Sequence, residues 1–368
     1  MKVDKVILHV IKMKLQKPFS THLGTVRERE GIIIEVVDDN GLRGFGEGVA
    51  FSTPWYTEET VGTSLHILQE VLVPLLLKSP FTHPKEISKL FSTVRRNNMA
   101  KAALECAIWD LYAKQLDQPL WKVIGGTREV IAAGAVAGAP TIMETIDQVH
   151  GLVREGYERI KVKISPKTDY ELIKGIRTEF PNLKLMADAN SAYTLDDAEH
   201  LKKLDDFGLE MIEQPLGIDD IYEHSLLQKN LKTHICLDES ITSLHDAKSA
   251  IALGSCRFIN IKLGRVGGYA TAVSIHDLCE REGVRVWCGG MIEFGISRAH
   301  NIALSTLAGF DFPGDISSSS RYWEEDIIEP AITVMDGKIF APKGPGIGVE
   351  LNRRRLQQVS LFTEKYSI

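Results

Sequence analysis

The chain has 368 residues, which is long for one small domain, so we expect two domains or one large barrel with an appendage. Hydrophobic residues make up 44% of it and charged residues 25%, the composition of an ordinary globular protein. The net charge of -6 argues against nucleic acid or an anionic membrane as the main partner.

The N-terminal stretch MKVDKVILHVIKMKLQKPF alternates like a strand and has neither a long apolar region nor a small-residue cleavage site. We therefore do not interpret it as a signal peptide, and no run approaches the length of a membrane span. Scattered cysteines without CxxC spacing indicate reduced, buried thiols in a cytoplasmic protein. They are Cys106, Cys236, Cys256, Cys279 and Cys288.

The first third of the chain reads as a mixed α+β unit. Alternating segments at 3–15 and 31–49 predict strands, and Asn40-Gly41 predicts a hairpin turn inside the second of them. Helical patterns follow at 57–77 and 99–116, before Gly125-Gly126 interrupts the pattern.

From about residue 130 short apolar strands alternate with amphipathic helical stretches, the pattern of βαβ units around a parallel sheet. The predicted strands are IAAGAVAG, RIKVKI, KLMADAN, EMIEQP, HICLDES, FINIKL, RVWCGG and GDISSSS. Lys163, Asp188, Glu213, Asp238 and Lys262 are separated by 25, 25, 25 and 24 residues, about the length of one βα unit.

Eight such units predict a (β/α)8 barrel. A leucine-rich solenoid has a similar repeat length, but the sequence has no LxxLxL pattern. A flat doubly wound sheet is the other alternative. A Rossmann fold would need GxGxxG after its first strand, and GRVGG at 264–268 has the wrong spacing.

Polar residues follow the apolar part of most of these strands, and strand ends converge on one mouth of a barrel. Three acids brought together would repel one another unless a cation lay among them. Oxygen ligands favour Mg²⁺, with Mn²⁺ as a substitute, over zinc. Any one of these acids, taken alone, is equally well explained as a cap of the helix that follows it. Three acids in register with two lysines favour a metal site formed by Asp188, Glu213 and Asp238.

The strand RIKVKI sends Lys161 and Lys163 to one face, and Lys262 ends a strand across the predicted barrel. Lysine acts as a base only when neutral, and the charge of Lys161 disfavours the charged form of Lys163. The alternative is that both lysines lie on the solvated face of an edge strand. That alternative fits poorly, because a strand inside a parallel barrel is buried on both faces. A lysine base with Mg²⁺ suits removal of a proton α to a carboxylate through an enediolate.

These strand-end motifs resemble the muconate-lactonizing subgroup of the enolase superfamily: KVK (161–163), DAN (188–190), EQP (213–215), DES (238–240) and NIKLGRVGG (260–268). Two further motifs resemble the o-succinylbenzoate synthases and N-acylamino acid racemases of that subgroup: GGMIEFGISRAHN (289–301) and GPGIGVE (344–350). The resemblance runs over nearly the whole chain.

The resemblance implies an α/β fold, a modified (β/α)8 barrel of the (β/α)7β type at 128–332 under an N-terminal α+β capping domain at 1–127. The tail at 333–368 would pack back towards the cap. The resemblance also implies that the acid triad binds Mg²⁺, that Lys163 and Lys262 face opposite sides of the substrate, and that Lys161 lies beside its carboxylate.

Two motif residues, Asn190 and Glu239, are expected to support this site rather than to bind the metal. Phe294 stands where that family usually has a small or hydroxyl residue. The walls of the substrate site are expected from the cap and the last two strands. Ordinary cap packing is an equal alternative for the aromatic residues of FSTPWY. The candidates are Phe19, His22, Phe51, Trp55, Tyr56, Gly289, Met291, Ile292, Ser317 and Ser318.

The function implied is that of a Mg²⁺-dependent o-succinylbenzoate synthase of menaquinone synthesis, with N-succinyl or other N-acylamino acid racemase activity beside it. The alternatives are an N-acylamino acid racemase, a muconate cycloisomerase-like enzyme, and a non-catalytic structural or binding protein. DISSSS lacks the Asp-x-Asp pair expected of dipeptide epimerases. The expected partners are a small carboxylate substrate and, because related barrels often associate, further copies of the chain.

Overall fold

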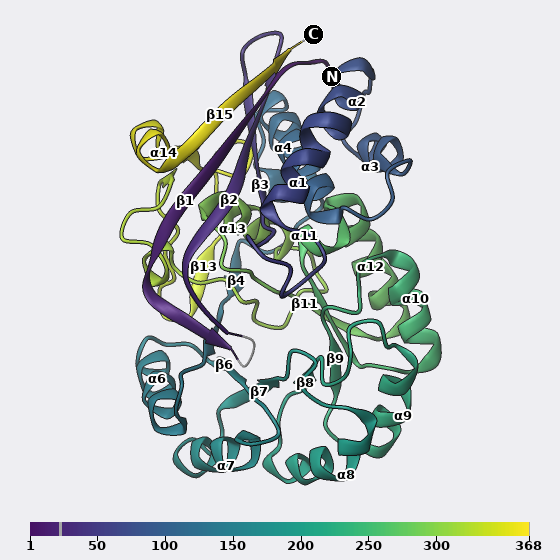
Figure 1. The fold of residues 1–368 in the computed structure, drawn as a ribbon, viewed down its shortest axis with the longest axis vertical. Coiled ribbons are helices and arrows are strands. Elements are labelled where there is room, and N and C mark those ends of the chain that lie inside the picture. Colours follow the sequence, from purple (N-terminus) through teal and green to yellow (C-terminus); the bar gives the residue numbers. More distant parts are fainter. Residues whose placement is uncertain (22–23, 368) are drawn as a thin grey trace.

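The computed structural model describes residues 1–21 and 24–367 and consists of a cap above a curled parallel sheet ringed by helices (Figure 1). The cap sheet is antiparallel in the order β15-β1-β2-β3. Its strands are β1 (Val3–Thr21), β2 (Gly24–Asp38), β3 (Arg43–Gly48) and β15 (Ser360–Ser367). The last strand of the chain thus pairs with the first.

The cap helices lie on one face of this sheet. They are α1 (Val61–Ile67), α2 (Val73–Lys78), α3 (Lys85–Phe91), α4 (Asn98–Gln115) and α5 (Leu120–Val123). Two glycines of β3 let α4 approach closely, since a Cβ at Gly44 would lie 2.1 Å from the carbonyl oxygen of Ala107. At Gly46 it would lie 2.0 Å from that of Ala103. The RGFGEG sequence is therefore a helix-docking surface.

A π-helical turn, η1 (Leu68–Leu72), joins α1 and α2 into one continuous apolar helix over Val61–Lys78. By length and composition this helix is long enough to cross a membrane, which the sequence pattern had not indicated. A single such helix is weak evidence for a membrane span, because core helices of soluble proteins meet the same criteria of length and composition. Here Leu68, Leu72, Val73 and Leu76 are buried in the core of the cap.

The barrel sheet has seven parallel strands in the described chain, each hydrogen-bonded to the next in sequence order. The predicted fold class is confirmed by this curled sheet and its cap. The strands are β5 (Gly134–Ala137), β6 (Arg159–Lys163), β7 (Lys184–Asp188), β8 (Ile212–Glu213), β9 (Ile235–Leu237), β10 (Phe258–Ile261) and β11 (Arg285–Cys288).

Helices follow the barrel strands and ring the outside of the sheet (Figure 1). They are α6 (Ile142–Arg154), α7 (Asp169–Glu179), α8 (Ala198–Leu201) between the 3₁₀ turns η2 (Leu195–Asp197) and η3 (Lys202–Phe207), α9 (Tyr222–Asn230), α10 (Leu244–Leu253), α11 (Leu263–Val266), α12 (Tyr269–Glu282) and α13 (Gly295–Leu304). Short pieces complete the chain: β4 (Val130–Ala132) with β13 (Lys338–Phe340), β12 (Ile328–Glu329) with β14 (Glu350–Leu351), η4 (Ser319–Arg321) and α14 (Arg353–Val359).

The eighth strand predicted at GDISSSS is reduced to an isolated bridge between Gly314 and Ala133. It still closes the barrel, because Gly134 N donates to Gly314 O (2.7 Å) and Asp315 N donates to Cys288 O (2.9 Å). The run of serines beyond it turns into the 3₁₀ helix η4 rather than continuing as a strand. Serine side chains favour such turns over a buried parallel strand.

Alternation along the strands separates an apolar layer from the polar ends. On β6, Ile160 and Val162 are fully buried on one face, while Lys161 lies on the other and pairs in register with Met186. The interior below the strand ends is filled by Met186, Met211, Cys236, Phe258, Trp287 and Phe312. This packed layer closes the bottom of the site that opens at the carboxyl ends.

Candidate active site

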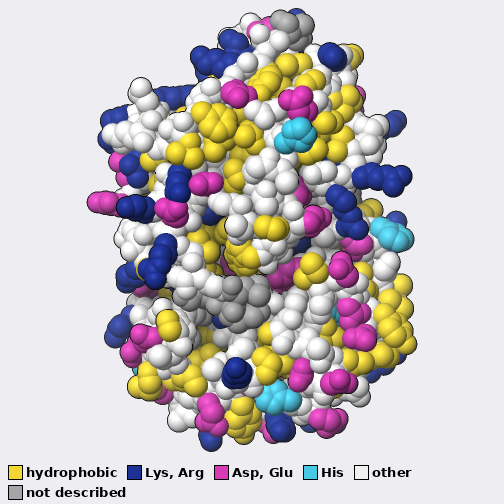
Figure 2. Space-filling view, viewed as in Figure 1, with side chains coloured by type: hydrophobic (Ala, Val, Ile, Leu, Met, Phe, Trp, Pro, Cys, Tyr) yellow, Lys and Arg dark blue, Asp and Glu magenta, His cyan; other side chains and the backbone are white. Residues whose placement is uncertain are grey.

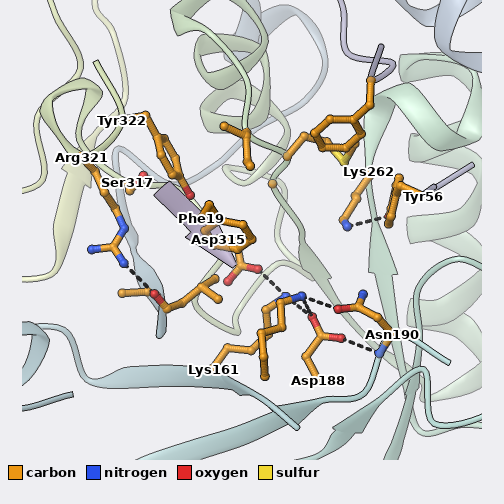
Figure 3. Close-up of a pocket in the computed structure, with 18 of the residues that line it drawn as sticks. Phe19, Tyr56, Lys161, Asp188, Asn190, Lys262, Asp315, Ser317, Arg321 and Tyr322 are labelled. Atoms are coloured by element: carbon orange, nitrogen blue, oxygen red, sulfur yellow. Dashed lines mark hydrogen bonds and ion pairs between the residues drawn. The ribbon is translucent and has the colours of Figure 1, made fainter. Parts of the chain in front are cut away.

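A cavity opens where the cap meets the carboxyl ends of the barrel strands, and both parts contribute its walls. Figure 3 shows Lys161, Asp188 and Asn190 on its floor, with Tyr56 and Lys262 towards one end and Arg321 and Tyr322 towards the other. It is lined by Phe19, Phe51, Trp55, Tyr56, Gly134, Ala135, Val136, Lys161, Lys163, Asp188, Asn190, Lys262, Gly290, Met291, Ile292, Asp315, Ser317, Arg321 and Tyr322.

The 25-residue spacing places three site residues side by side. Lys163 is the register partner of Asp188, and Asp188 is the register partner of Glu213. Lys163 Nζ donates to Asp188 Oδ2 (2.7 Å) and to Asn190 Oδ1 (2.6 Å). Asp238 lies two residues beyond Cys236, the partner of Glu213, and therefore on the same face of the sheet.

Lys161 is surrounded by carboxylates. Its Nζ lies 2.9 Å from Glu213 Oε2, 3.1 Å from Asp188 Oδ2 and 2.7 Å from Asp315 Oδ2. Burial opposes its charge, but Asp315, Glu213 and Asp188 outweigh burial and hold the pKa of Lys161 well above its ordinary value. Lys161 is therefore a permanent cation beside Lys163, with which it shares Asp188.

Lys262 follows β10 and meets the cap. Its Nζ donates to Asp238 Oδ2 (2.9 Å) and to the hydroxyl of Tyr56 (2.8 Å). Burial opposes the charge, but Asp238 and Tyr56 raise the pKa of Lys262 above its ordinary value. Arg265 donates to Asp238 Oδ1 and, over 3.1 Å, to the same Tyr56 hydroxyl. Tyr56 in turn donates to Asp238 Oδ2 (3.1 Å), so a cap residue holds this cluster from above.

The three acids proposed as metal ligands are almost fully buried, with side-chain exposures of 2% for Asp188, 0% for Glu213 and 1% for Asp238. Burial and the neighbouring Asp188 raise the pKa of Glu213 to about 7, so the carboxylates are close enough to repel. Within residues 1–21 and 24–367 no three potential ligands are grouped around a common point. Lys161 instead bridges Asp188 and Glu213.

The two residues predicted to support the site connect Lys163 to the loop after β9. Asn190 accepts from Lys163 and donates through Nδ2 to Glu239 Oε1 (2.9 Å). Burial, then Asp238 and Asp188, raise the pKa of Glu239 to about 8. Asn190 has a φ of 42°, a left-handed conformation that asparagine tolerates better than most residues.

Of the predicted wall residues, seven line the cavity: Phe19, Phe51, Trp55, Tyr56, Met291, Ile292 and Ser317. Phe51 and Trp55 also pack on each other, with ring centroids 4.6 Å apart. Gly289 is not among the lining residues; a Cβ there would lie 2.6 Å from Lys262 Cε. Ser318 lines an adjoining outer cavity and accepts from Val334 N (2.8 Å). His22 lies outside the described residues.

Phe294, the departure from the family pattern, does not line the cavity. Its ring is fully buried and stacks on Trp323 with centroids 4.8 Å apart. Its N–H donates to Glu47 Oε1 of β3 (2.8 Å). The residue thus packs between the barrel and the cap, and its size does not narrow the substrate space directly.

Several site residues were missed from the sequence. Asp315 stands in DISSSS and neutralises Lys161 and Arg159, each at 2.7 Å. Gln214, the middle of EQP, accepts from Asp238 N (3.0 Å) and Ser240 N (3.2 Å), and so orients the next strand end. The only feature of the sequence that could have indicated Asp315 and Gln214 is their position at the end of a strand. Many residues without a role in a site share that position. Asn260, Arg265, Arg321 and Tyr322 were also missed, as were the lining residues Gly134, Ala135, Val136 and Gly290.

Two family models match the two parts of the chain. Residues 3–125 match the N-terminal domain of mandelate racemase and muconate lactonizing enzyme, and residues 144–355 match the enolase C-terminal domain-like family. The chain belongs to the enolase superfamily. These matches confirm the predicted resemblance. The chain is an enzyme, as the names of its relatives and the residues of its site both indicate.

Individual relatives cover this enolase-superfamily chain almost completely. It is 53% identical to the o-succinylbenzoate synthase of Geobacillus stearothermophilus, over 99% of the chain and 97% of that protein. It is 43% identical to the N-succinylamino acid racemase of Thermus thermophilus, over 98% of each. A crystal structure of an enolase-superfamily member from Listeria innocua superimposes with a TM-score of 0.97 at 44% identity, covering 100% of this chain and 99% of that one.

Tyr56→Phe is expected to lower kcat/KM about tenfold, because one hydroxyl serves Lys262, Arg265 and Asp238 together. The aromatic wall of the cavity would remain. Steady-state kinetics measure the effect, with Tyr170→Phe on the exposed side of α7 as the matched control. An unchanged kcat/KM in Tyr56→Phe would show that the cap contact with Lys262 has no part in turnover.

Proposed function

We propose that this chain is an o-succinylbenzoate synthase that dehydrates 2-succinyl-6-hydroxy-2,4-cyclohexadiene-1-carboxylate. The proposal is carried by one observation: Lys163 and Lys262 line a single cavity beside the buried acids Asp188 and Asp238. Relatives named o-succinylbenzoate synthase at 44–53% identity over nearly the full length support this choice among the reactions of the superfamily.

In this reaction Lys163 removes the proton α to the ring carboxylate. The hydroxyl group then leaves the ring as water with the proton that Lys163 has taken up, and the ring becomes aromatic. Lys262, which Asp238 and Tyr56 hold as a cation, stabilises the enediolate from the other side. Lys161 is held as a cation by three carboxylates and lies beside the substrate carboxylate.

We further propose that Asp188, Glu213 and Asp238 hold Mg²⁺, with Mn²⁺ as a substitute. The donor set fits a hard divalent cation, since all three side chains are buried carboxylates and no described histidine lines the cavity. Burial and then the neighbouring carboxylate of Asp188 raise the pKa of Glu213, so a cation among these acids would stabilise their charged forms. The bound ion would supply a Lewis acid that stabilises negative charge on the substrate carboxylate.

A second candidate is racemization of N-succinyl or other N-acylamino acids, as main or additional activity. It uses the same pair of lysines, one on each side of the α-carbon, and relatives named N-succinylamino acid racemase support it. A muconate cycloisomerase-like activity has less support. A non-catalytic role has least, because both lysines and all three acids are present in register.

The wider setting is proposed from the same reasoning. An o-succinylbenzoate synthase belongs to menaquinone synthesis, and all five cysteines are free and buried, which suits the cytoplasm. Charges of both signs are mixed over the face in Figure 2, which suits a small-molecule substrate better than nucleic acid or a membrane. We also propose a homo-oligomer, and a cap at 1–127, barrel at 128–332 and tail at 333–368.

The test is direct assay of both activities with the purified protein and Mg²⁺. We expect formation of o-succinylbenzoate from the cyclohexadiene substrate, and slower loss of optical rotation of N-succinyl-L-phenylalanine. If racemization is fast and dehydration is absent, the racemase is the main activity. Absence of both reactions would overturn the proposal.

A further inference from the structure

The catalytic cavity adjoins a second, outer cavity on the side away from Lys262. Four residues line both: Phe19, Val136, Arg321 and Tyr322. In Figure 3 Arg321 and Lys262 lie at opposite ends of the catalytic cavity, with Phe19 and Asp315 between them. Arg321 therefore lies where the two spaces adjoin, at the opposite end of the catalytic cavity from Lys262.

The guanidinium of Arg321 is oriented but not neutralised. Its NH2 donates to the carbonyl oxygen of Val136 (2.6 Å), which fixes the side chain against β5. Among residues 1–21 and 24–367 no carboxylate oxygen lies within 4.0 Å of it. Two arginines within the site differ, since Arg159 pairs with Asp315 and Arg265 with Asp238. Most of the donors of Arg321 remain available.

The surroundings also decide where an anion would stop. The outer cavity beyond Arg321 carries the exposed acids Glu144, Asp147 and Glu155, against one lysine, Lys17. These acids repel a negative group that would extend further out. A planar guanidinium on the lining of the inner cavity is suited to a bidentate contact with a carboxylate.

We propose that Arg321 binds the distal carboxylate of the acyl chain of the substrate, and so selects a succinyl chain over a neutral one. This rests on the proposed function, which places the first carboxylate at the acids and lysines. The second carboxylate, at the end of a four-carbon chain, then reaches the opposite end of the cavity. Arg321 is a binding residue in this assignment and takes no part in proton transfer.

The experiment compares two ligands that differ only in that carboxylate: o-succinylbenzoate and 2-butanoylbenzoate, in which a methyl group replaces it. Calorimetric titration of the Mg²⁺-saturated protein should give about 30- to 100-fold tighter binding of the succinyl compound. Arg321→Met should bind the two within about threefold, and Arg321→Lys should retain part of the preference. Lys17→Met, the matched control in the outer cavity, should keep all of it.

Unchanged binding of 2-butanoylbenzoate by Arg321→Met is the internal control for folding. A preference retained by Arg321→Met would overturn the assignment, as would an equal loss for both ligands, which would indicate a structural role. No preference in the unmodified protein would also overturn it. The dehydration assay separates this from failure of the proposed function: active protein without a preference rejects the Arg321 site alone.

Discussion

Lys163→Ala is expected to reduce kcat for dehydration by at least about 10³-fold, with substrate affinity changed much less. Both lysines of β6 line the cavity, and Lys163 has the more exposed side chain, 17% against 4% for Lys161. Lys161 cannot replace it, since three carboxylates hold that side chain as a cation. Steady-state kinetics and titration with o-succinylbenzoate separate the chemical step from binding.

The matched control is Lys167→Ala, four residues along the same loop and exposed to solvent. It should leave kcat and KM within about twofold, as surface substitutions usually do. Turnover near that of the unmodified protein in Lys163→Ala would end the proposed mechanism. A parallel loss of ligand binding would instead indicate that the variant had disturbed Asp188 and Asn190, its two partners.

Exhaustive chelation is expected to lower activity to below about 1%, and added Mg²⁺ or Mn²⁺ to restore it. The protein should remain folded throughout. Lys161, Lys163 and Lys262 each pair with an acid of the triad, so the carboxylates have counter-charges without an ion. Circular dichroism before and after chelation checks the fold while the dehydration assay follows activity.

A pair of variants tests which acids are responsible for the Mg²⁺ requirement. Asp188→Asn should raise the Mg²⁺ concentration needed for half-maximal activity by at least about tenfold, because one anionic ligand is lost. Asp219→Asn, an exposed acid after β8, should leave that concentration unchanged. Full activity after chelation, or an identical Mg²⁺ requirement in Asp188→Asn, would contradict the assignment of the acid triad.

The register of the polar strand ends could be predicted because it follows from a repeat that can be read directly from the sequence. A constant separation of 25 residues brings Lys163, Asp188 and Glu213 to neighbouring register positions, as the observed pairing has them. Alternation on β6 puts Ile160 and Val162 against the outer layer and both lysines inside. The weak point was GDISSSS, where a serine-rich stretch forms a bridge and a 3₁₀ turn instead of a strand.

Contacts between distant segments were not predictable from pattern. Tyr56 meets Lys262 across 206 positions, and which residue of the FSTPWY loop does so depends on how the cap lies on the barrel. Ser318 lies on the outer cavity and Gly289 packs against Asn260, so neither lines the inner cavity as expected. Their neighbours Gly290 and Ser317 line it instead.

By itself the sequence determined the barrel and the register of Lys163, Asp188 and Glu213 at its strand ends, because strand alternation and a fixed repeat can be read from the chain. Only the tertiary structure decided the charge balance around Lys161, since Asp315 reaches it across the barrel closure. It alone also put Arg321 at the far end of the cavity without a counter-charge, because ion pairing depends on distances between side chains that no local pattern encodes.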